Sequence, residues 1–365
     1  MKREIHAHNY GIDALRILSM FYMVLLHSLT AGGILDAAEP NSIIYIIGWF
    51  LATWSYCAVD IFGIISGYVC YSETIKDHQY TSYIKLWLEV VFYNIVATTV
   101  MYMIHPDSFN LHLFISNFFP VTMNLYWYFT AYTALYVVMP LVNAGIRGCS
   151  VTTLKKLLVL ILLLFSVYET MSHKFGTNGG YIFVWLLMLY IVGAIIKKCG
   201  FPKSLRIIKS IILILLLVSL SVAWKVIGFE FDFCGLQFSC DMLISYTSPT
   251  IILIALIHVL YATDIKLSSK AVRAVKYLSS GTFAVYILNC QRYIWQYVMT
   301  GSFAPLIRFP IYIVVFCVFS FSALFTVWAI IIDIIRQKLF FDFRIDSFAQ
   351  FSNNILQRLL SKIGI

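Results

Sequence analysis

Three ionisable residues share one face of the first long apolar segment of this chain: Asp13, Arg16 and His27. At about 100° per residue, the step from Arg16 to His27 makes three helical turns plus about 20°, and Asp13 lies about 60° from Arg16. The rise of about 1.5 Å per residue separates Arg16 from His27 by about 16 Å along the helix axis. A charged group inside a bilayer costs about 2.5–3.5 kcal/mol on insertion scales, so each of these residues is a candidate functional residue.

This arrangement suits a long substrate whose anionic end binds Arg16 and whose reacting group reaches His27. A guanidinium group matches phosphate oxygens, and histidine transfers protons near neutral pH. In this interpretation Asp13 orients Arg16. The structural alternative is an Asp13–Arg16 pair that anchors the helix at the membrane interface, with His27 as a core residue bonded to a carbonyl group.

Further polar residues fall inside later apolar segments. Asp60 could orient the histidine, neutralise an arginine or serve helix packing. Arg292 needs an acidic or anionic partner, and the candidates are Asp60, Glu169 and a substrate phosphate. Tyr128 either belongs to the interfacial aromatic belt or donates a hydrogen bond at the depth of the histidine. Asn289 is close to Arg292 in sequence and can form hydrogen bonds there.

The histidines and cysteines do not predict a metal site. His6 and His8 form a His-x-His pair, but they have no third ligand. The 8 cysteines include no CxxC motif. Cys234 and Cys240 share one predicted outer loop, where they are either a disulfide or two free thiols.

The elements that must position these residues are apolar segments long enough to cross a bilayer. The 365 residues are 61% hydrophobic and 12% charged, whereas soluble proteins have roughly 45–50% and about 25%. The mean hydropathy is +0.86. We therefore predict an all-α, polytopic membrane protein with a single domain over residues 1–365, and we exclude soluble, disordered, collagen-like and disulfide-rich classes. The ten predicted spans are 10–33, 43–70, 83–104, 124–145, 154–172, 181–196, 207–227, 244–262, 277–299 and 310–335.

The segments that connect these spans alternate in charge. One side holds nearly all of the 26 Lys and Arg residues, and the other carries acids such as Asp36, Glu39 and Asp107. This positive-inside pattern places both termini in the cytoplasm. The net charge of +9 is therefore a topology signal that also favours anionic lipids, and no nucleic-acid binding is expected. Residues 336–365 are predicted as a cytoplasmic tail with an amphipathic helix on the inner membrane surface.

Several of these stretches together resemble the acyltransferase-3 family of bacterial membrane proteins. NYGIDALRILSMFYMVLLHS, with Arg16 and His27, resembles its opening span, which is marked by a basic residue, ten positions and then a histidine. AVDIFGIISGYV resembles its second-span signature, and LYWYFTAYTALYVVMPLVN resembles its Trp–aromatic stretch before a proline. The likeness covers nearly the whole chain. In one departure, Asn289 stands where the family commonly has a second histidine, which puts a base at that position in doubt.

The resemblance implies an O-acyltransferase of the stand-alone type, without an attached extracellular esterase-like domain. Such a protein moves an acyl group, usually acetyl from cytoplasmic acetyl-CoA, to a hydroxyl of an envelope carbohydrate. His27 would be the base or a transient acyl carrier, and Arg16 with Asp13 would bind the CoA phosphates. Tyr128, Asn289 or Arg292 would stabilise the oxyanion.

The expected partners are acyl-CoA as co-substrate, a carbohydrate acceptor and the lipid bilayer of the bacterial cytoplasmic membrane. No permanently bound cofactor is expected, and homo-oligomerisation is left open. The acyl group is acetyl or succinyl. The main alternative is a transporter of a small solute or a lipid-linked sugar, which would use the same polar face without covalent chemistry.

Overall fold

The structure is a computed structural model that describes residues 8–74, 79–200 and 207–362. His6, the partner of His8 in the pair discussed above, lies outside the described residues, as do several residues counted in the charge pattern: Lys2, Arg3, Lys76, Lys203 and Arg206.

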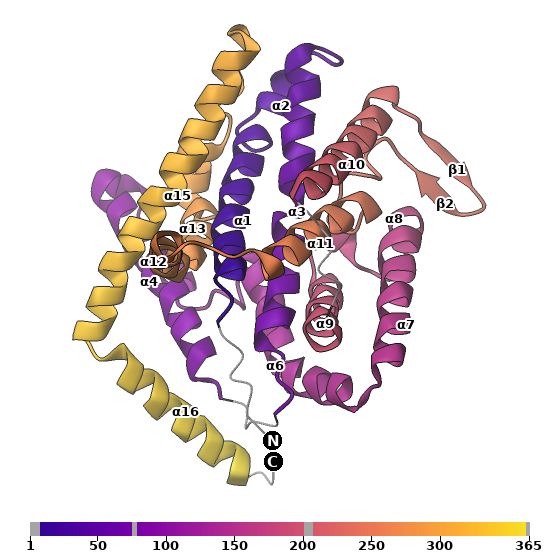
Figure 1. Cartoon of the computed structure of the whole chain (residues 1–365). Coiled ribbons are helices and arrows are strands. Elements are labelled where there is room, and N and C mark those ends of the chain that lie inside the picture. Colours follow the sequence, from indigo (N-terminus) through magenta and orange to yellow (C-terminus); the bar gives the residue numbers. More distant parts are fainter. Residues whose placement is uncertain (1–7, 75–78, 201–206, 363–365) are drawn as a thin grey trace.

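Most of the described chain is helical (Figure 1). Before the first gap lie α1 (Tyr10–Leu29), α2 (Ile34–Ala37) and α3 (Ile43–Cys70). Between the two gaps lie α4 (Thr81–Ile104), η1 (Pro106–Ser108), α5 (Leu111–Ser116), α6 (Trp127–Gly148), α7 (Val151–Ile161), η2 (Leu162–Tyr168), α8 (Glu169–Ser172), η3 (Asn178–Gly180) and α9 (Phe183–Cys199). After the second gap lie α10 (Ile207–Ile227), β1 (Phe231–Phe233), β2 (Leu236–Phe238), α11 (Pro249–Asp264), α12 (Ser269–Leu278), η4 (Ser279–Gly281), α13 (Thr282–Asn289), α14 (Arg292–Ile294), η5 (Trp295–Met299), η6 (Ala304–Arg308), α15 (Ile311–Asp342) and α16 (Ile345–Lys362).

This architecture confirms the all-α, polytopic prediction. Among the described residues, 7 helical segments are long and apolar enough to cross a membrane. Two other predicted spans correspond to the shorter helices α9, with 17 residues, and α11, with 16 residues. The remaining one, 277–299, is interrupted after α13. The count of ten spans and the cytoplasmic placement of the termini stay predictions.

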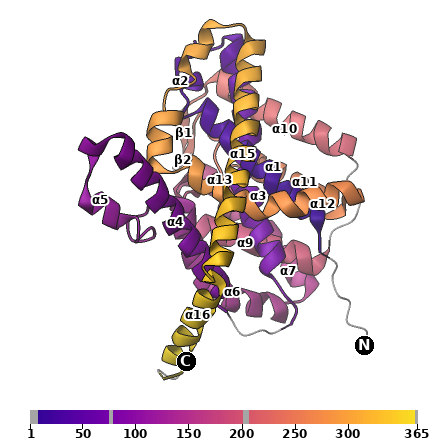
Figure 2. The ribbon, with the colours of Figure 1, turned by 90° about the vertical axis from the view of Figure 1, so that its left-hand side faces the viewer.

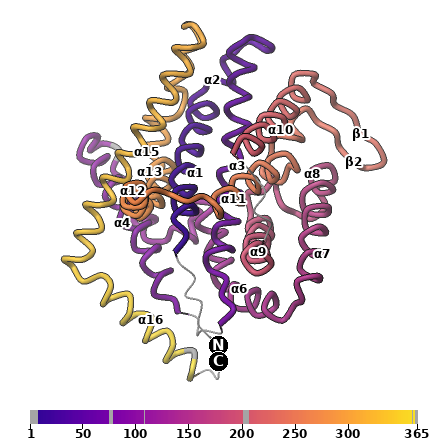
Figure 3. Tube along the Cα trace, viewed as in Figure 1, coloured from indigo at the N-terminus to yellow at the C-terminus, as the bar shows by residue number. Residues whose placement is uncertain are grey.

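Helices α1 and α3 form the centre of the molecule. In Figures 1 and 3, α9, α10 and α11 lie on the α3 side, while α4, α13 and α15 lie on the α1 side. Each side has an apolar core of its own. Trp185 and Ile61 are fully buried in the first core, and Val24 and Ala329 are fully buried in the second. Because α1 contributes to both cores, its polar face is held at the junction between them.

The start of α1 is fixed by a capping residue. The side-chain oxygen of Asn9 accepts hydrogen bonds from the backbone N–H groups of Gly11 and Ile12, which satisfies two donors of the first turn. The amide nitrogen of Asn9 donates to the carbonyl of Thr263 in α11. The cap therefore sets both the first residue of α1 and its position relative to α11.

Two glycines allow α3 and α9 to approach closely. A Cβ atom at Gly67 would lie 1.8 Å from the carbonyl oxygen of Tyr190, and one at Gly193 would lie 1.9 Å from that of Ile64. Since small residues let helix backbones pack closely in membranes, this crossing needs glycine on both helices.

A β-hairpin is the departure from all-helical structure in the described part of the chain. Strands β1 and β2 pair antiparallel, with Phe231 opposite Phe238. Cys234 and Gly235 form the two-residue turn with φ of 50° and 79°, as a tight hairpin turn requires. Cys234 and Cys240 are both free, so of the two alternatives for this loop the structure has the free thiols.

The boundary between the last long helix and the C-terminal tail lies later in the chain than predicted. Helix α15 runs to Asp342, beyond the predicted end at 335, and α16 then turns away from it, as Figure 1 shows. In the view of Figure 2, α16 lies below α15, at the end of the molecule where the C-terminus is marked. Helix α16 packs on α4, where Asp346 lies 2.7 Å from Lys85 and Asn353 accepts from the N–H of Tyr80. The predicted helix in the tail is confirmed, while its position on the inner membrane surface stays a prediction.

We expect Gly193→Ala to destabilise the protein because its methyl group must displace the α3 backbone. The cost of such overpacking is about 1–3 kcal/mol. Gly145→Ala is the matched control, since a Cβ there meets nothing within 4 Å, and it should leave stability unchanged or raise it slightly. Thermal unfolding of the purified protein in detergent measures both variants. Equal melting temperatures for the two variants would contradict the close crossing.

Candidate active site

A cavity of about 920 Å³ lies beside His27. Residues of α1, α3 and α6 line it, together with the irregular segment between α13 and η5. His27, Tyr128, Arg292 and Trp295 are among the lining residues, and much of the remaining wall is aromatic. The volume lies within the range of sites that bind small molecules.

A hydrogen bond to Asn289 sets the tautomer of His27. The Nδ1 atom of His27 lies 2.5 Å from the side-chain oxygen of Asn289, which is fully buried. An amide oxygen only accepts hydrogen bonds, so Nδ1–H donates and Nε2 of the neutral ring carries the lone pair. The ring of Trp295 packs edge-on against the imidazole at 4.9 Å between centroids. His27 is therefore held as a base with a defined proton-accepting nitrogen.

The interruption of the predicted ninth span brings these groups together. Helix α13 ends at Asn289, and Gln291 starts the next helical turn by accepting hydrogen bonds from the N–H groups of Tyr293 and Ile294. Segment η5, which includes Trp295, continues as a π-helix. Irregular backbone at membrane depth is tolerated where it lines a cavity, and π-helical turns often occur at functional sites.

Arg292 also lines the cavity, and neither of its two candidate carboxylate partners pairs with it. Its side chain is exposed and forms no salt bridge with any residue that the structure describes. Of the three candidate partners, the two protein carboxylates are engaged elsewhere.

Asp60 and Glu169 both accept hydrogen bonds from groups other than Arg292. Asp60 is fully buried and accepts a hydrogen bond from the indole nitrogen of Trp185 at 2.9 Å, which fits the helix-packing interpretation. Glu169 accepts from the N–H of Phe175 and from both the N–H and the hydroxyl of Thr177. It thereby closes the loop after α8. The structure brings neither carboxylate to His27 or Arg292.

Tyr128 lies in the cavity wall with its hydroxyl buried. This hydroxyl has no hydrogen-bond partner among the described residues, while nearby Ser66 donates to the carbonyl of Phe62. An unpaired buried hydroxyl can donate to a group that enters the cavity.

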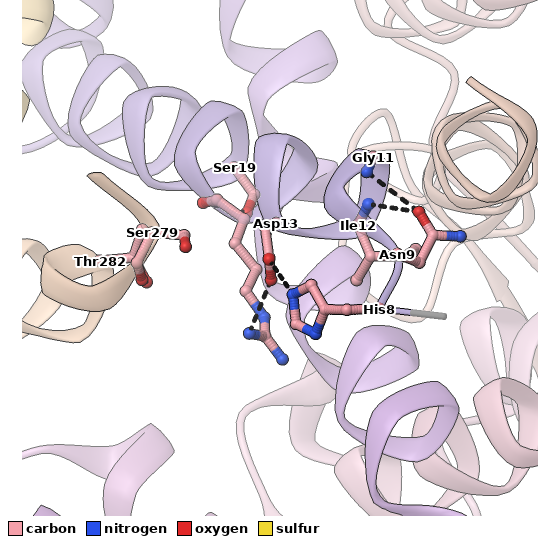
Figure 4. A network of polar contacts seen from close by, with 9 residues as sticks. His8, Asn9, Gly11, Ile12, Asp13, Ser19, Ser279 and Thr282 are labelled. Carbon is pink, nitrogen blue, oxygen red and sulfur yellow. Dashed lines mark hydrogen bonds and ion pairs between the residues drawn. The ribbon is translucent and has the colours of Figure 1, made fainter. Parts of the chain in front are cut away.

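Asp13 and Arg16 form a separate polar cluster nearer the start of α1. The guanidinium of Arg16 donates to Asp13 at 3.3 Å, and the other carboxylate oxygen of Asp13 contacts His8, as the dashed lines in Figure 4 show. The side chain of Arg16 is 28% exposed and that of Asp13 is 7% exposed. His8, considered above as half of a metal-binding pair, is thus a neighbour of this carboxylate.

Two methionines separate this polar cluster from the cavity. Arg16, Met20, Met23 and His27 follow each other at helical spacing on one face of α1. Met20 and Met23 are buried and line the cavity, whereas Arg16 does not. The structure thus brings Tyr128, Asn289 and Arg292 to the His27 cavity and leaves Asp13 and Arg16 behind the methionines.

A buried charge cluster joins α4 to α15, and sequence reasoning missed it. Arg336 donates to Asp333 at 2.7 and 3.0 Å and lies 3.3 Å from Glu89. Asp333 also accepts from Tyr93 and Gln337. Arg336 had been assigned to the cytoplasmic tail, but it is buried because α15 extends past it. The Asp–Arg pair three positions apart on one helix is the signal that could have revealed it.

The fold and the site together define a polytopic helical membrane protein with a histidine-centred cavity. A comparison with known protein families matches residues 9–332 to the acyltransferase domain. The chain belongs to the acyltransferase-3 family, and it is a membrane acyltransferase. No curated protein and no solved structure gave a significant match.

We expect Arg336→Met to destabilise the protein by about 3–5 kcal/mol, because it leaves two buried carboxylates without their cation. Lys338→Met removes an exposed charge two positions further along the same helix and should change stability by less than about 0.5 kcal/mol. Chemical unfolding of the purified proteins in detergent measures the free energy of unfolding of both variants. Similar small changes for both variants would show that the cluster does not hold α4 to α15.

Proposed function

We propose that this protein is an O-acyltransferase of the bacterial cytoplasmic membrane. It takes an acyl group, acetyl in the first instance, from cytoplasmic acyl-CoA and transfers it to a hydroxyl of an envelope carbohydrate on the outer side. The observation that carries this proposal is the Nδ1-anchored His27 in the cavity wall, on the same helix face as Arg16.

The phosphate end of the donor binds at Arg16. Asp13 occupies one N–H of the guanidinium, which leaves further donors for the CoA phosphates. The pantetheine arm of CoA is roughly as long as the Arg16–His27 rise of about 16 Å. Its path runs along the α1 face that Met20 and Met23 fill. Methionine side chains are flexible, so they can move aside for the arm.

The acceptor enters the cavity from the other side. Its wall includes Trp49, Trp127, Tyr181 and Tyr246. Aromatic faces in such a wall can pack against the C–H faces of a sugar ring, and this leaves the hydroxyl edge for polar groups.

The chemistry follows from the free lone pair on His27. Nε2 removes the proton from the acceptor hydroxyl while its oxygen attacks the thioester carbonyl. The Tyr128 hydroxyl and the Arg292 guanidinium are the groups available to stabilise the oxyanion. When the tetrahedral intermediate collapses, the C–S bond breaks and the CoA thiolate takes the proton from His27. A route in which His27 carries the acyl group also begins at this nitrogen.

We expect His27→Gln to reduce acyl transfer by about 10²–10⁴-fold, because it removes the imidazole nitrogen that accepts the proton of the acceptor hydroxyl. Asn289→Leu should lose about 10–100-fold, since Nδ1 loses its acceptor, whereas Asn289→Asp keeps an acceptor and should retain most activity. Release of the CoA thiol from acetyl-CoA by purified protein in lipid measures all three.

His112→Gln is the control, because His112 is exposed and lies outside the cavity. His27→Gln with activity near that of this control would refute the role of His27. If no acyl-CoA releases thiol while vesicles take up a solute, the transporter alternative is correct.

We expect Arg16→Gln to raise the KM for acetyl-CoA by about 10-fold or more with a smaller change in kcat, because it weakens phosphate binding and leaves the reacting groups in place. Lys338→Gln, which removes an exposed basic side chain elsewhere, should leave the KM unchanged. Steady-state kinetics with varied donor concentration gives both constants. An unchanged KM in Arg16→Gln would show that Arg16 has only a structural role.

A further inference from the structure

A smaller polar pocket of about 180 Å³ adjoins the His27 cavity. It lies between α4, the segment from α5 to α6, and the interruption after α13. Tyr126, Cys290 and Arg292 line both spaces. The two spaces therefore share part of a wall, and Arg292 belongs to it.

Asn94 presents an unpaired donor in this pocket. Its side chain is 3% exposed, and its oxygen accepts a hydrogen bond from the hydroxyl of Tyr126 at 2.8 Å. Its amide nitrogen is buried without a partner among the described residues. A buried unpaired donor costs about 1–3 kcal/mol, which an incoming acceptor atom would recover.

Several other polar side chains of the pocket are already engaged within the protein. Asn117 donates to the hydroxyl of Thr98, and the side-chain oxygen of Gln291 accepts from two backbone N–H groups. No Asp or Glu is among the described residues that line the pocket. Arg292 adds a positive charge that no described carboxylate neutralises. A site with unpaired N–H groups and a guanidinium selects anionic oxygens.

We propose that this pocket binds an anionic group of the carbohydrate acceptor, held by Arg292 and the amide of Asn94. The group is a phosphate or a carboxylate carried by the sugar, since both present oxygens that accept from these donors. This inference rests on the proposed acyl transfer for the identity of the ligand as acceptor. The guanidinium of Arg292 has five N–H donors, so besides the oxyanion it can hold this group and orient the sugar so that a hydroxyl faces His27.

The test measures binding to the full-length protein in lipid nanodiscs by tryptophan fluorescence. The probes are glucose 1-phosphate, methyl glucuronide and neutral methyl glucoside. We expect at least one anionic sugar to bind 10-fold or more tightly than the glucoside. Preference for the phosphate or for the carboxylate identifies the source of the charge, and either result supports the pocket. Equal affinity for all three sugars overturns it.

Variants of the pocket residues test whether the anionic sugar binds there. Arg292→Gln and Asn94→Asp should each weaken the preferred anion 10-fold or more and change glucoside binding less than twofold. Asn94→Asp preserves the acceptor for Tyr126 but replaces the donor with a negative charge, and Asn94→Ser serves if the aspartate variant does not fold. Arg308→Gln, at another exposed arginine outside the pocket, should bind like wild type. Unchanged anion affinity in Arg292→Gln overturns the proposal.

CoA release, measured on the same wild-type preparation, separates the two proposals. Release of CoA without any preference for an anionic sugar overturns the pocket and leaves acyl transfer intact. Anion binding through Arg292 without CoA release from any acyl-CoA supports the pocket and refutes acyl transfer.

Discussion

The hydrogen bond from His27 to Asn289 is the interaction on which the site depends. It joins residues 262 positions apart and requires α1 and the end of α13 to meet at a fixed separation. The packing of α1 and α13 against α15 maintains that separation, and the interruption after Asn289 turns the chain so that Trp295 covers the imidazole. A histidine without this acceptor could hold its proton on either nitrogen. With it, the base is defined before a substrate enters.

Some polar side chains within the helices are paired with other residues of the protein, whereas others have no such partner. Arg336 pairs with both Glu89 and Asp333 between α4 and α15, and Glu169 closes a loop. These groups stabilise the fold. The Tyr128 hydroxyl and the Asn94 amide are unpaired, and Arg292 has no carboxylate partner in the described chain. All three line the two adjoining spaces, where a bound molecule could pair with them.

The parts of this structure that follow from short-range patterns could be predicted from the sequence. The all-α class, most helix bounds and the shared face of Arg16 and His27 depend on hydrophobic periodicity within single segments. Contacts between segments could not be predicted. Nothing near Asp60 indicates that Trp185 donates to it, and hydropathy does not show that the chain breaks after Asn289. The predicted end of the last span, at 335, falls short of the end of α15 at Asp342, because contacts with Glu89 and Asp333 bury Arg336 within this helix.

In the proposed mechanism the donor reaches His27 from the side of the membrane that carries the basic segments. The most direct test compares acetyl-CoA added outside inverted membrane vesicles with acetyl-CoA added outside right-side-out vesicles, both from cells that produce the protein. Acetyl-CoA does not cross the bilayer, so the account predicts protein-dependent release of the CoA thiol in inverted vesicles alone. Equal release in both orientations, or release confined to right-side-out vesicles, would contradict it.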